Sequence, residues 1–296
     1  MKIGFIVNPR AGTHHNAYEE VSALAGKLVA LGHTITLHKT QGPGDATVMA
    51  RNLVQQGYDV IASAGGDGTA NETAQGVMDS DSAFTIIPYG SGNGLARGLA
   101  IPLKPSAAVQ GIPNGKVRRI DVGQLIDGSQ VRLFFGFAGI GYDAYIGRLF
   151  NQRKGRRGLL PYVYLSLTAY NGYAPVALTL KADDVLYSGK PFILAIANTD
   201  EYGNGARIAP NAVPDDGVFD ISMIQSMSFV KGLLNGWRLF NGTIDKVKDV
   251  VSLRVQEAEV IPSGKIYYHM DGEARETNNT LHFKILPGRL KVLVPN

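Results

Sequence analysis

Cysteine is absent from the 296 residues of the sequence, which excludes disulfide bonds, thiolate zinc sites and cysteine nucleophiles. The six histidines form no HExxH pair, and there is no GxSxG nucleophile motif. Gly111 to Lys116 has the pattern GxxxGK followed by Val117, which does not match a Walker phosphate-binding loop. The two glycine-rich loops described below do not fit GxGxxG, because Asn71 or Arg97 stands at the third position. We therefore do not expect a dinucleotide-dependent dehydrogenase.

Long apolar runs and a large excess of one charge are also lacking. No run approaches the roughly 18 residues that a membrane span needs, and a strand-like segment, KIGFIVNP, begins the chain in place of a signal peptide. We therefore expect a cytoplasmic protein that attaches to membranes only peripherally. The 29 basic and 25 acidic residues give a net charge of +4 without a recognisable reader motif, so we expect no nucleic-acid partner.

Five cations cluster within ten residues, at Arg148, Arg153, Lys154, Arg156 and Arg157. At an anionic leaflet each could contribute about 1 kcal/mol to binding. The apolar residues that follow include Leu159, Leu160, Tyr162, Tyr164 and Leu165. They either enter the membrane interface or form the core-facing side of a helix, and the sequence leaves both interpretations open.

Glycines are abundant, and the first informative group lies between Tyr58 and Val77. An apolar strand (60–64) is followed by Gly65, Gly66 and Gly68, and then by a helix that we expect to open at Thr69. Thr69 and Glu72 have the spacing of a capping box, which would leave other first-turn amides available to an anion. An ordinary tight turn is the alternative.

A second glycine-rich turn follows the next predicted strand, 83–88. Gly90, Gly92 and Gly94 alternate with Ser91 and Asn93, and a short helix begins near Asn93 and ends before Pro102. Because ligands collect at the carboxyl ends of strands in an open parallel sheet, the two turns would present backbone amides to one polyphosphate.

The remaining pattern predicts two domains. Strands at 3–7 and 34–38 alternate with helices at 17–31 and 45–56, which indicates a parallel sheet for residues 1–120. Residues 121–286 read as a mainly antiparallel β domain, with strands at 121–126, 131–138, 176–180 and 192–197 and a hairpin at Asp127-Gly128. We expect one long helical insert at about 144–170, a further helix at 228–240, and a domain boundary near 112–116.

Several segments together resemble the diacylglycerol kinase catalytic-domain family, which includes bacterial lipid kinases and sphingosine and ceramide kinases. The resemblance rests on NPRAG (8–12), GGDGTANE (65–72), PYGSGNGLARGLAIP (88–102), RRIDVG (118–123), the stretch from Ala197 to Ile224, HMDGE (269–273) and LPGRLKVLVP (286–295). It implies an N-terminal NAD kinase/phosphofructokinase-like α/β domain and a C-terminal β-sandwich. It also implies that the last strand, about 287–296, returns to the first domain.

The resemblance implies a site for ATP at the edge of the first sheet. Its residues would be Asn8, Pro9, Arg10, Thr40, Gly65, Gly66, Asp67, Gly68, Thr69, Asn71, Glu72, Gly90, Ser91 and Asn93. Asp67 brings a carboxylate into a place made for anions, where Mg²⁺ between the two would relieve the repulsion. The alternative is that Asp67 caps its own turn.

Catalytic and further metal residues are implied in the second domain. Asp271 would accept the proton of the lipid hydroxyl, with Glu273 supporting it or binding metal, although an Asp-Gly pair is also a common hairpin turn. Asp216 would hold a structural Mg²⁺ with the carbonyls of Val213 and Val218, and Asp121 would belong to the supporting water network. A solvated acidic turn is the alternative reading of that segment.

We therefore expect an ATP- and Mg²⁺-dependent lipid kinase that phosphorylates a primary hydroxyl at an anionic membrane surface, in a cleft between its domains; a homodimer is compatible with the sequence. The alternatives are an NAD kinase and a catalytically silent lipid-binding relative. The sequence departs from the diacylglycerol-type pattern at Gly94, where an aspartate is usual, and is closer there to the sphingosine-kinase form. This leaves the lipid class open.

Overall fold

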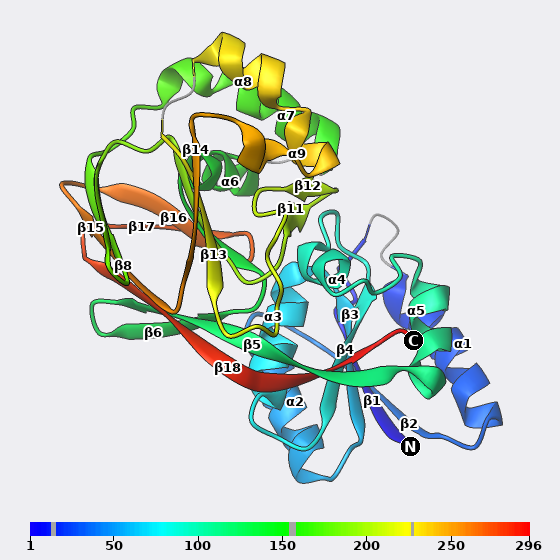
Figure 1. Cartoon of the computed structure of the whole chain (residues 1–296). Coiled ribbons are helices and arrows are strands. Elements are labelled where there is room, and N and C mark those ends of the chain that lie inside the picture. The colour runs from blue at the N-terminus through cyan, green and yellow to red at the C-terminus, as the bar shows by residue number, and fades with distance from the viewer. Residues whose placement is uncertain (13–15, 154–157, 226–227) are drawn as a thin grey trace. The chain divides into compact units, whose positions relative to one another are not determined.

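The computed structural model describes residues 1–12, 16–153, 158–225 and 228–296. The chain divides into two compact units: one comprises Met1–Ile120 and Gly288–Asn296, and the other comprises Asp121–Pro287. Two long strands, β5 (Lys116–Asp127) and β18 (Leu281–Val294), carry the chain from one unit to the other. Figure 1 shows the elements in chain order.

The N-terminal unit contains a parallel sheet. Its strands β1 (Lys2–Val7), β2 (Thr34–Lys39), β3 (Val60–Gly65) and β4 (Ala83–Pro88) lie in the order β2-β1-β3-β4. The last residues of β18 run parallel to β4, with Val292 opposite Phe84. Both β3 and β4 are buried along their whole length, which explains why their sequences are mainly apolar and do not alternate with exposed polar residues.

Helices connect these strands. They are α1 (Ala17–Ala30), α2 (Asp45–Gln55) and α3 (Asp67–Val77), followed after β4 by α4 (Gly94–Gly98) and α5 (Pro105–Gly111). The α2 and α3 helices approach closely because Gly76 carries no side chain: a methyl group there would lie 2.5 Å from the Cβ of Ala50. The predicted alternation of strands and helices around a parallel sheet is confirmed.

The C-terminal unit is a β-sandwich. One layer is an antiparallel sheet in the order β14-β13-β10-β7-β16-β17. Its strands are β7 (Phe137–Gly141), β10 (Ile193–Ala197), β13 (Phe219–Ile224), β14 (Val250–Val255), β16 (Ile266–Met270) and β17 (Glu273–Thr277). The other layer contains the β5-β6 hairpin and β8, β9, β15 and the first residues of β18, with β6 at Gln130–Phe134, β8 at Leu178–Ala182, β9 at Val185–Gly189 and β15 at Glu257–Pro262.

Side chains from both layers form one core. Phe134 of β6, Phe219 of β13 and Phe283 of β18 are almost completely buried, and the Phe134 and Phe219 rings stack with their centroids 5.6 Å apart. Packing of two sheets through their inward-facing residues is the defining feature of a sandwich. The predicted fold class, an α/β domain followed by a mainly antiparallel β-sandwich, is therefore confirmed.

Several element predictions need correction. The predicted strand 131–138 is two strands, β6 and β7, in different layers, because the chain leaves one sheet at Phe135 and enters the other at Phe137. The predicted strand 176–180 begins two residues later, as β8. The Asp127-Gly128 hairpin between β5 and β6 is confirmed, with Gly128 at a φ of 58°.

The two helical predictions in this unit are also corrected. The predicted insert at 144–170 contains two helices, α6 (Tyr142–Gln152) and α7 (Leu159–Thr168), because Arg153 adopts an extended backbone that ends α6. The helix predicted at 228–240 is two short helices, α8 (Phe229–Asn235) and α9 (Arg238–Asn241), with Gly236 between them. Within the described ranges, no helix is long and apolar enough to cross a membrane.

Candidate active site

The first glycine turn follows β3 directly. Gly66 has an extended backbone and takes the N-cap position, so α3 begins at Asp67, two residues before the predicted start. The predicted capping box is therefore wrong: Thr69 lies inside the first helical turn, and its Oγ1 accepts a hydrogen bond from Asn8 Nδ2 at 3.2 Å. Because no side chain among the described residues caps this helix, its N-terminal amides and dipole form a suitable site for an anion.

The second glycine turn touches the first. A methyl group at Gly90 would lie 2.7 Å from the Cα of Gly66, so the two backbones are in contact only because both residues lack a side chain. Asn93 holds the second turn in shape: its Oδ1 accepts from Gly90 N at 2.9 Å, its Nδ2 donates to Gly90 O at 2.8 Å, and its φ is 50°. The predicted convergence of the two loops is confirmed.

Asp67 reaches from the first turn to the second. Its Oδ1 accepts a hydrogen bond of 3.4 Å from Leu95 N, in the first turn of α4, and a methyl group at Gly92 would lie 3.2 Å from its Oδ2. The side chain therefore lies against the second loop. Gly94, the departure from the diacylglycerol-type pattern, is the buried first residue of α4.

The ends of the neighbouring strands join the same edge of the sheet. Asn8 N donates to Ala64 O at 2.9 Å, and Thr40 N donates to Val7 O at 3.0 Å. Asn8 Oδ1 also accepts from Arg10 N at 3.0 Å. Backbone and side-chain contacts thus connect the residues after β1 with the ends of β2 and β3 and with the start of α3.

Two predicted nucleotide residues on α3 contact other parts of the helix layer. Glu72 Oε2 accepts from Ala46 N of α2 at 3.3 Å, and Asn71 Oδ1 accepts from Gln75 Nε2 at 2.6 Å. The structure therefore brings Asn8, Asp67 and Thr69 together with the second loop, whereas the Glu72 side chain belongs to the contact between α2 and α3.

In the C-terminal unit, Asp271 lies at the tip of the β16-β17 hairpin. Asp271 and Gly272 have φ values of 45° and 87°, as a two-residue type I′ turn requires. The Asp271 carboxylate accepts three backbone N–H bonds, from Phe135 to Oδ2 at 2.9 Å and from Gly136 and Phe137 to Oδ1 at 2.9 and 3.1 Å. These donors lie where the chain passes from β6 to β7, so they hold the Asp271 carboxylate in contact with the segment that connects the two strands.

Glu273 lies just beyond this turn and is exposed, where it pairs with Arg275 at 3.2 Å. Asn151 of α6 supports the turn by donating from Nδ2 to Gly272 O at 3.1 Å. The structure therefore places the predicted base and its predicted helper on one hairpin, with the aspartate rigidly held and the glutamate on the surface.

A buried polar network behind the hairpin was missed by sequence analysis. His269 Nε2 lies 3.1 Å from Asp143 Oδ2, and Tyr202 donates to the same oxygen at 2.8 Å. Burial raises the pKa of the Tyr202 hydroxyl well above its ordinary value, and the Asp143 charge raises it further. Gly139 makes room for the pair, because a methyl group there would lie 2.1 Å from Asp143 Oδ2. The only signal in the sequence was His269 in the HMDGE segment.

The acidic turn after β12 (Ala206–Arg207) contains the predicted metal residues. Asp121 Oδ2 accepts from Gly217 N at 2.7 Å, and Asp216 Oδ1 accepts from Val218 N at 3.3 Å. Arg254 of β14, which sequence analysis missed, pairs with Asp216 and lies 3.8 Å from Asp220. Burial and the Asp216 charge raise the pKa of Asp220, whereas Arg254 lowers it.

A divalent cation fits the chemistry of this turn, although a guanidinium already faces it. Asp216 offers a hard carboxylate oxygen, and Val213 and Val218 belong to the same turn and carry backbone carbonyls. Among the described residues there is no group of three or more His, Cys, Asp or Glu side chains that could hold a metal ion. Metal at this turn would therefore depend on one carboxylate and backbone oxygens, beside Arg254.

Two family models match most of the chain. The diacylglycerol kinase catalytic domain matches residues 2–125, and the YegS C-terminal NAD kinase beta sandwich-like domain matches residues 136–294. The two units thus have the domain pair of a kinase. The chain belongs to the diacylglycerol kinase catalytic-domain family, as the resemblance predicted.

Individual relatives span nearly the same length. A diacylglycerol kinase of Mycobacterium tuberculosis is 30% identical over 278 residues, covering 92% of this chain and 88% of the relative. A diacylglycerol kinase of Bacillus subtilis is 26% identical over 277 residues, covering 90% and 88%. A crystal structure of a diacylglycerol kinase from Bacillus anthracis has a TM-score of 0.70 at 21% identity, covering 100% of this chain and 97% of that chain, and supports the fold.

Proposed function

We propose that this protein is an ATP- and Mg²⁺-dependent lipid kinase that phosphorylates the primary hydroxyl of a diacylglycerol-like or sphingoid lipid. The observation that carries the proposal is the contact between the two glycine loops, with Asp67 crossing from one to the other. Relatives of nearly the same length that are named diacylglycerol kinase support it.

The N-terminal unit supplies the nucleotide site in this proposal. Backbone amides of the two loops and the uncapped start of α3 bind the phosphates, and Asn8 and Thr69 connect the strand ends behind them. Asp67 fits a Mg²⁺ ion, because a carboxylate beside phosphates needs a cation between them. The bound Mg²⁺ would offset the charge that develops on the transferred phosphoryl group.

Asp271 positions the acceptor in the C-terminal unit. Three N–H donors keep its carboxylate in one orientation, from which it accepts a hydrogen bond from the substrate hydroxyl and then the proton. A strong base is unnecessary, because the transition state of phosphoryl transfer is loose and the proton leaves late. Glu273, exposed on the same hairpin, would support Asp271 or bind metal.

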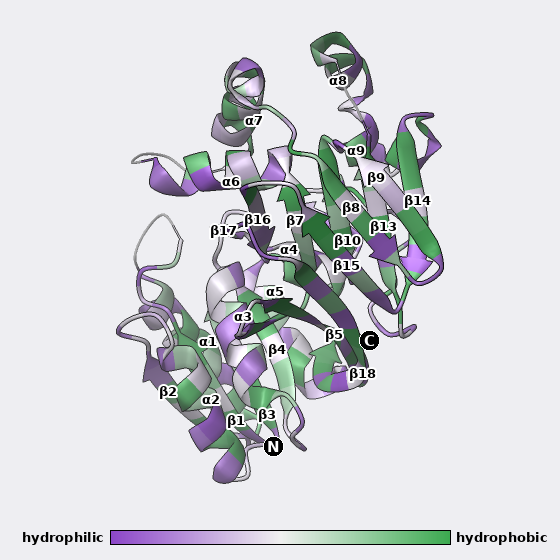
Figure 2. Ribbon diagram, turned by 90° about the vertical axis from the view of Figure 1, so that its left-hand side faces the viewer, coloured by the Kyte–Doolittle hydropathy of each residue, from purple (hydrophilic) through white to green (hydrophobic). Residues whose placement is uncertain are grey.

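Exposed apolar residues on two helical segments support delivery of the substrate from a bilayer. On α7, Leu160 and Tyr164 are 82% and 63% exposed; on α8, Val230, Leu233 and Leu234 are 60–65% exposed. Figure 2 shows apolar residues along both helices, which project from the same end of the β-rich unit. Exposed large apolar side chains gathered on neighbouring segments mark an interaction site.

The charge around these helices is suited to anionic lipids. The α7 helix carries no charged residue, and residues 228–249 carry four cations and two acids, a net charge of +2. Both interpretations of the apolar residues of α7 apply, to different residues. Leu160 and Tyr164 are exposed and are available to a membrane, whereas Leu159, Tyr162 and Leu165 are half-buried. In the basic cluster, Arg148 pairs with Glu276 at 2.7 Å, and Lys154, Arg156 and Arg157 lie outside the described residues.

The decisive assay measures transfer of labelled γ-phosphate from ATP, with Mg²⁺, to lipids in mixed micelles. The panel contains diacylglycerol, monoacylglycerol, phosphatidylglycerol, sphingosine and ceramide, with NAD as a soluble acceptor. Asp271→Asn is the test variant, and Asp184→Asn, in the exposed β8-β9 turn, is the matched control. A labelled lipid that is lost only with Asp271→Asn supports the proposal. Labelling of NAD would identify an NAD kinase, and no labelling of any acceptor would favour a silent lipid-binding relative.

Membrane docking is tested separately by vesicle sedimentation. Changing Leu160 and Leu234 together to serine should weaken binding to vesicles that contain anionic lipid by roughly tenfold. At each position the serine lacks part of the transfer free energy that a leucine gains when the membrane buries it. Leu186→Ser, at a leucine of β9 that is 69% exposed, is the control and should have no effect. Equal binding by all three proteins would remove α7 and α8 from the membrane-binding surface.

A further inference from the structure

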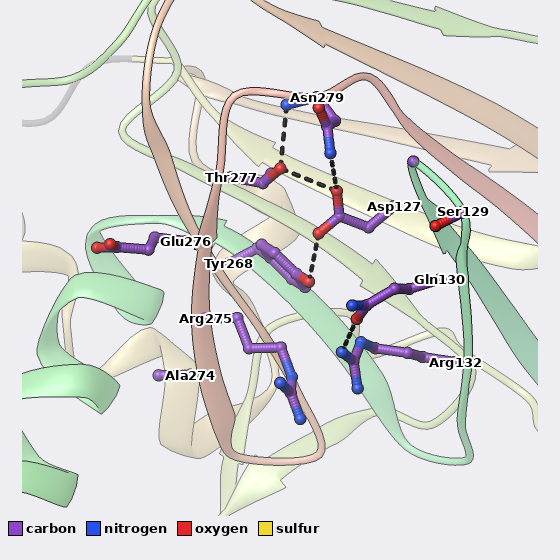
Figure 3. A pocket seen from close by; sticks show the side chains of 11 residues that line it. Asp127, Ser129, Gln130, Arg132, Tyr268, Ala274, Arg275, Glu276, Thr277 and Asn279 are labelled. Carbon is purple, nitrogen blue, oxygen red and sulfur yellow. Dashed lines mark hydrogen bonds between the residues drawn. The ribbon is translucent and has the colours of Figure 1, made fainter.

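A hollow in the C-terminal unit lies where the β5-β6 hairpin meets the β16-β17 hairpin. Its volume is about 590 Å³, and its lining includes Asp127, Arg132, Tyr268, Arg275, Thr277 and Asn279. Figure 3 shows these side chains converging on the hollow from both hairpins. None of them was assigned a role in nucleotide binding, metal binding or proton transfer.

Asp127 forms a rigid part of its wall. Its carboxylate accepts hydrogen bonds from Tyr268 Oη at 2.9 Å, Thr277 Oγ1 at 2.8 Å and Asn279 Nδ2 at 2.8 Å. Burial alone would raise the pKa of the Asp127 carboxyl, but these three hydrogen bonds and the positive charge of Arg132 outweigh burial and hold the pKa below its ordinary value. The carboxylate is therefore ionised and is bonded to uncharged donors.

Two arginines line the same hollow. Arg132 extends from β6, where one terminal nitrogen pairs with Gln130 Oε1, and Arg275 extends from β17, where one terminal nitrogen pairs with Glu273 at 3.2 Å. The Nε donor of each arginine is buried and has no hydrogen-bond partner within the described part of the chain. A buried donor without an acceptor is unusual in a folded protein, and an acceptor oxygen from a ligand would satisfy it.

The charge of the surrounding groups favours an anion. The other acidic residue of the lining, Glu276, is held by Arg148 and Lys265, each at 2.7 Å. Together with Arg132 and Arg275 these make four cations against the three carboxylates of Asp127, Glu273 and Glu276, a net charge of +1. Burial raises the pKa of the Tyr268 hydroxyl in the lining, and the positive charges of Arg132 and Arg275 each lower that pKa.

We propose that this hollow binds a phosphate-type oxyanion between Arg132 and Arg275. The planar guanidinium group presents forked N–H donors that match two oxygens of a phosphate, so two such groups from neighbouring hairpins suit one tetrahedral anion. The side-chain amide of Gln130, also in the lining, is a further donor. The ligand is inorganic phosphate, a small phosphomonoester or the phosphomonoester headgroup of a lipid, which share this chemistry.

The test measures binding of inorganic phosphate to the full chain by calorimetry and by its effect on the unfolding temperature. Arg132→Gln and Arg275→Gln should each weaken the binding of phosphate at least tenfold. Gln130→Glu keeps both arginines and should also weaken the binding, because its new carboxylate repels the phosphate. Arg51→Gln, at an exposed position on α2, is the charge-matched control and should bind as the unchanged protein does. The unfolding temperature without phosphate shows whether each variant is folded.

Two further arms identify the source of the anion. Glycerol 3-phosphate is titrated as a free phosphomonoester, and vesicles of phosphatidylcholine with and without phosphatidic acid are sedimented with the protein. Loss of glycerol 3-phosphate binding in Arg132→Gln assigns a free ligand, and loss of phosphatidic acid-dependent sedimentation in the same variant assigns a lipid headgroup. Unchanged phosphate binding in all three hollow variants, or no saturable binding by the unchanged protein, would overturn the proposal.

Discussion

In the N-terminal unit, the loops that surround Asp67 are shaped by what their residues lack: Gly66 and Gly90 touch backbone to backbone, and a methyl group at Gly90 would lie 2.7 Å from the other loop. In the C-terminal unit, the hairpin that carries Asp271 is shaped by what its side chain adds, because one carboxylate holds three backbone N–H groups. The first region should therefore be sensitive to added atoms, and the second to lost acceptor oxygens.

The largest expected effect is that of Asp271→Asn. An asparagine offers one acceptor oxygen, so at least one of the N–H groups of Phe135, Gly136 and Phe137 loses its partner, at a cost of about 1–3 kcal/mol in the free energy of unfolding. Loss of the proton acceptor should also lower kcat by about 10²- to 10⁴-fold. Denaturant unfolding and initial transfer rates measure the two effects.

ATP binding distinguishes the two regions in this variant. Because Asp271 belongs to the C-terminal unit and the glycine loops belong to the N-terminal unit, Asp271→Asn should leave the Kd for ATP nearly unchanged. A kcat equal to that of the unchanged protein would show that Asp271 is only a hairpin residue. A large rise in the Kd for ATP would show that the two regions are not separate in their effects.

The second expected effect is that of Gly90→Ala. Its methyl group would be 2.7 Å from the Cα of Gly66 and from Asn93 Oδ1, so the loops must separate, and overpacking of this kind costs about 1–3 kcal/mol. We expect ATP affinity to fall by roughly tenfold or more, since about 1.4 kcal/mol corresponds to a factor of ten. Titration with ATP measures it.

Gly68→Ala is the matched control in the same loop. A methyl group there meets no atom within 4 Å, and alanine favours the helix that Gly68 helps to begin. The control should therefore bind ATP roughly tenfold more tightly than Gly90→Ala does. Equal losses in both variants would mean that the loss of glycine flexibility, and not the contact between the loops, determines the affinity.

The sequence predicted the parts of these regions that depend on local pattern. Continuous apolar runs located β3 and β4, and alternating glycines located the two loops, because a parallel sheet brings the ends of its strands to one edge. The start of α3 was misplaced, because Gly66 caps the helix with its backbone alone and leaves no side-chain signature. Local pattern therefore predicts the position of a loop more reliably than the residue at which the following helix begins.

Contacts between distant segments were beyond the sequence. Nothing near Asp271 indicates that residues 135–137, more than 130 positions earlier, donate to its carboxylate. Arg254 likewise lies 38 positions from Asp216 along the chain. The strand-like run at 131–138 concealed the change of layer, because buried phenylalanines at 134, 135 and 137 continue through the crossing without a polar break. Such features depend on which strands pair, and this is decided by packing over the whole unit.

The smallest expected effect sharpens the comparison within the C-terminal unit, which has another Asp-Gly turn at Asp216. There the carboxylate faces the Arg254 guanidinium, whereas Asp271 faces backbone donors. The Arg254 side chain is 58% exposed, so Arg254→Gln should lower the free energy of unfolding by at most about 1 kcal/mol. It should also raise the pKa of Asp220 further, because Arg254 opposes the effect of burial.

The sign of the accompanying pH dependence follows from that pKa. A carboxyl whose pKa is raised by folding binds more protons in the folded state, so its contribution to stability is present below the unfolded pKa and is lost as the pH rises through the folded pKa. Arg254→Gln should therefore extend this loss to higher pH, measured by thermal unfolding and by an NMR titration of the Asp220 carboxyl.

Added Mg²⁺ should restore stability more in this variant than in Lys284→Gln, which breaks the exposed pair with Glu257, if the turn also accepts a divalent cation. An equal response to Mg²⁺ in both variants would leave Arg254 as the cation of this turn.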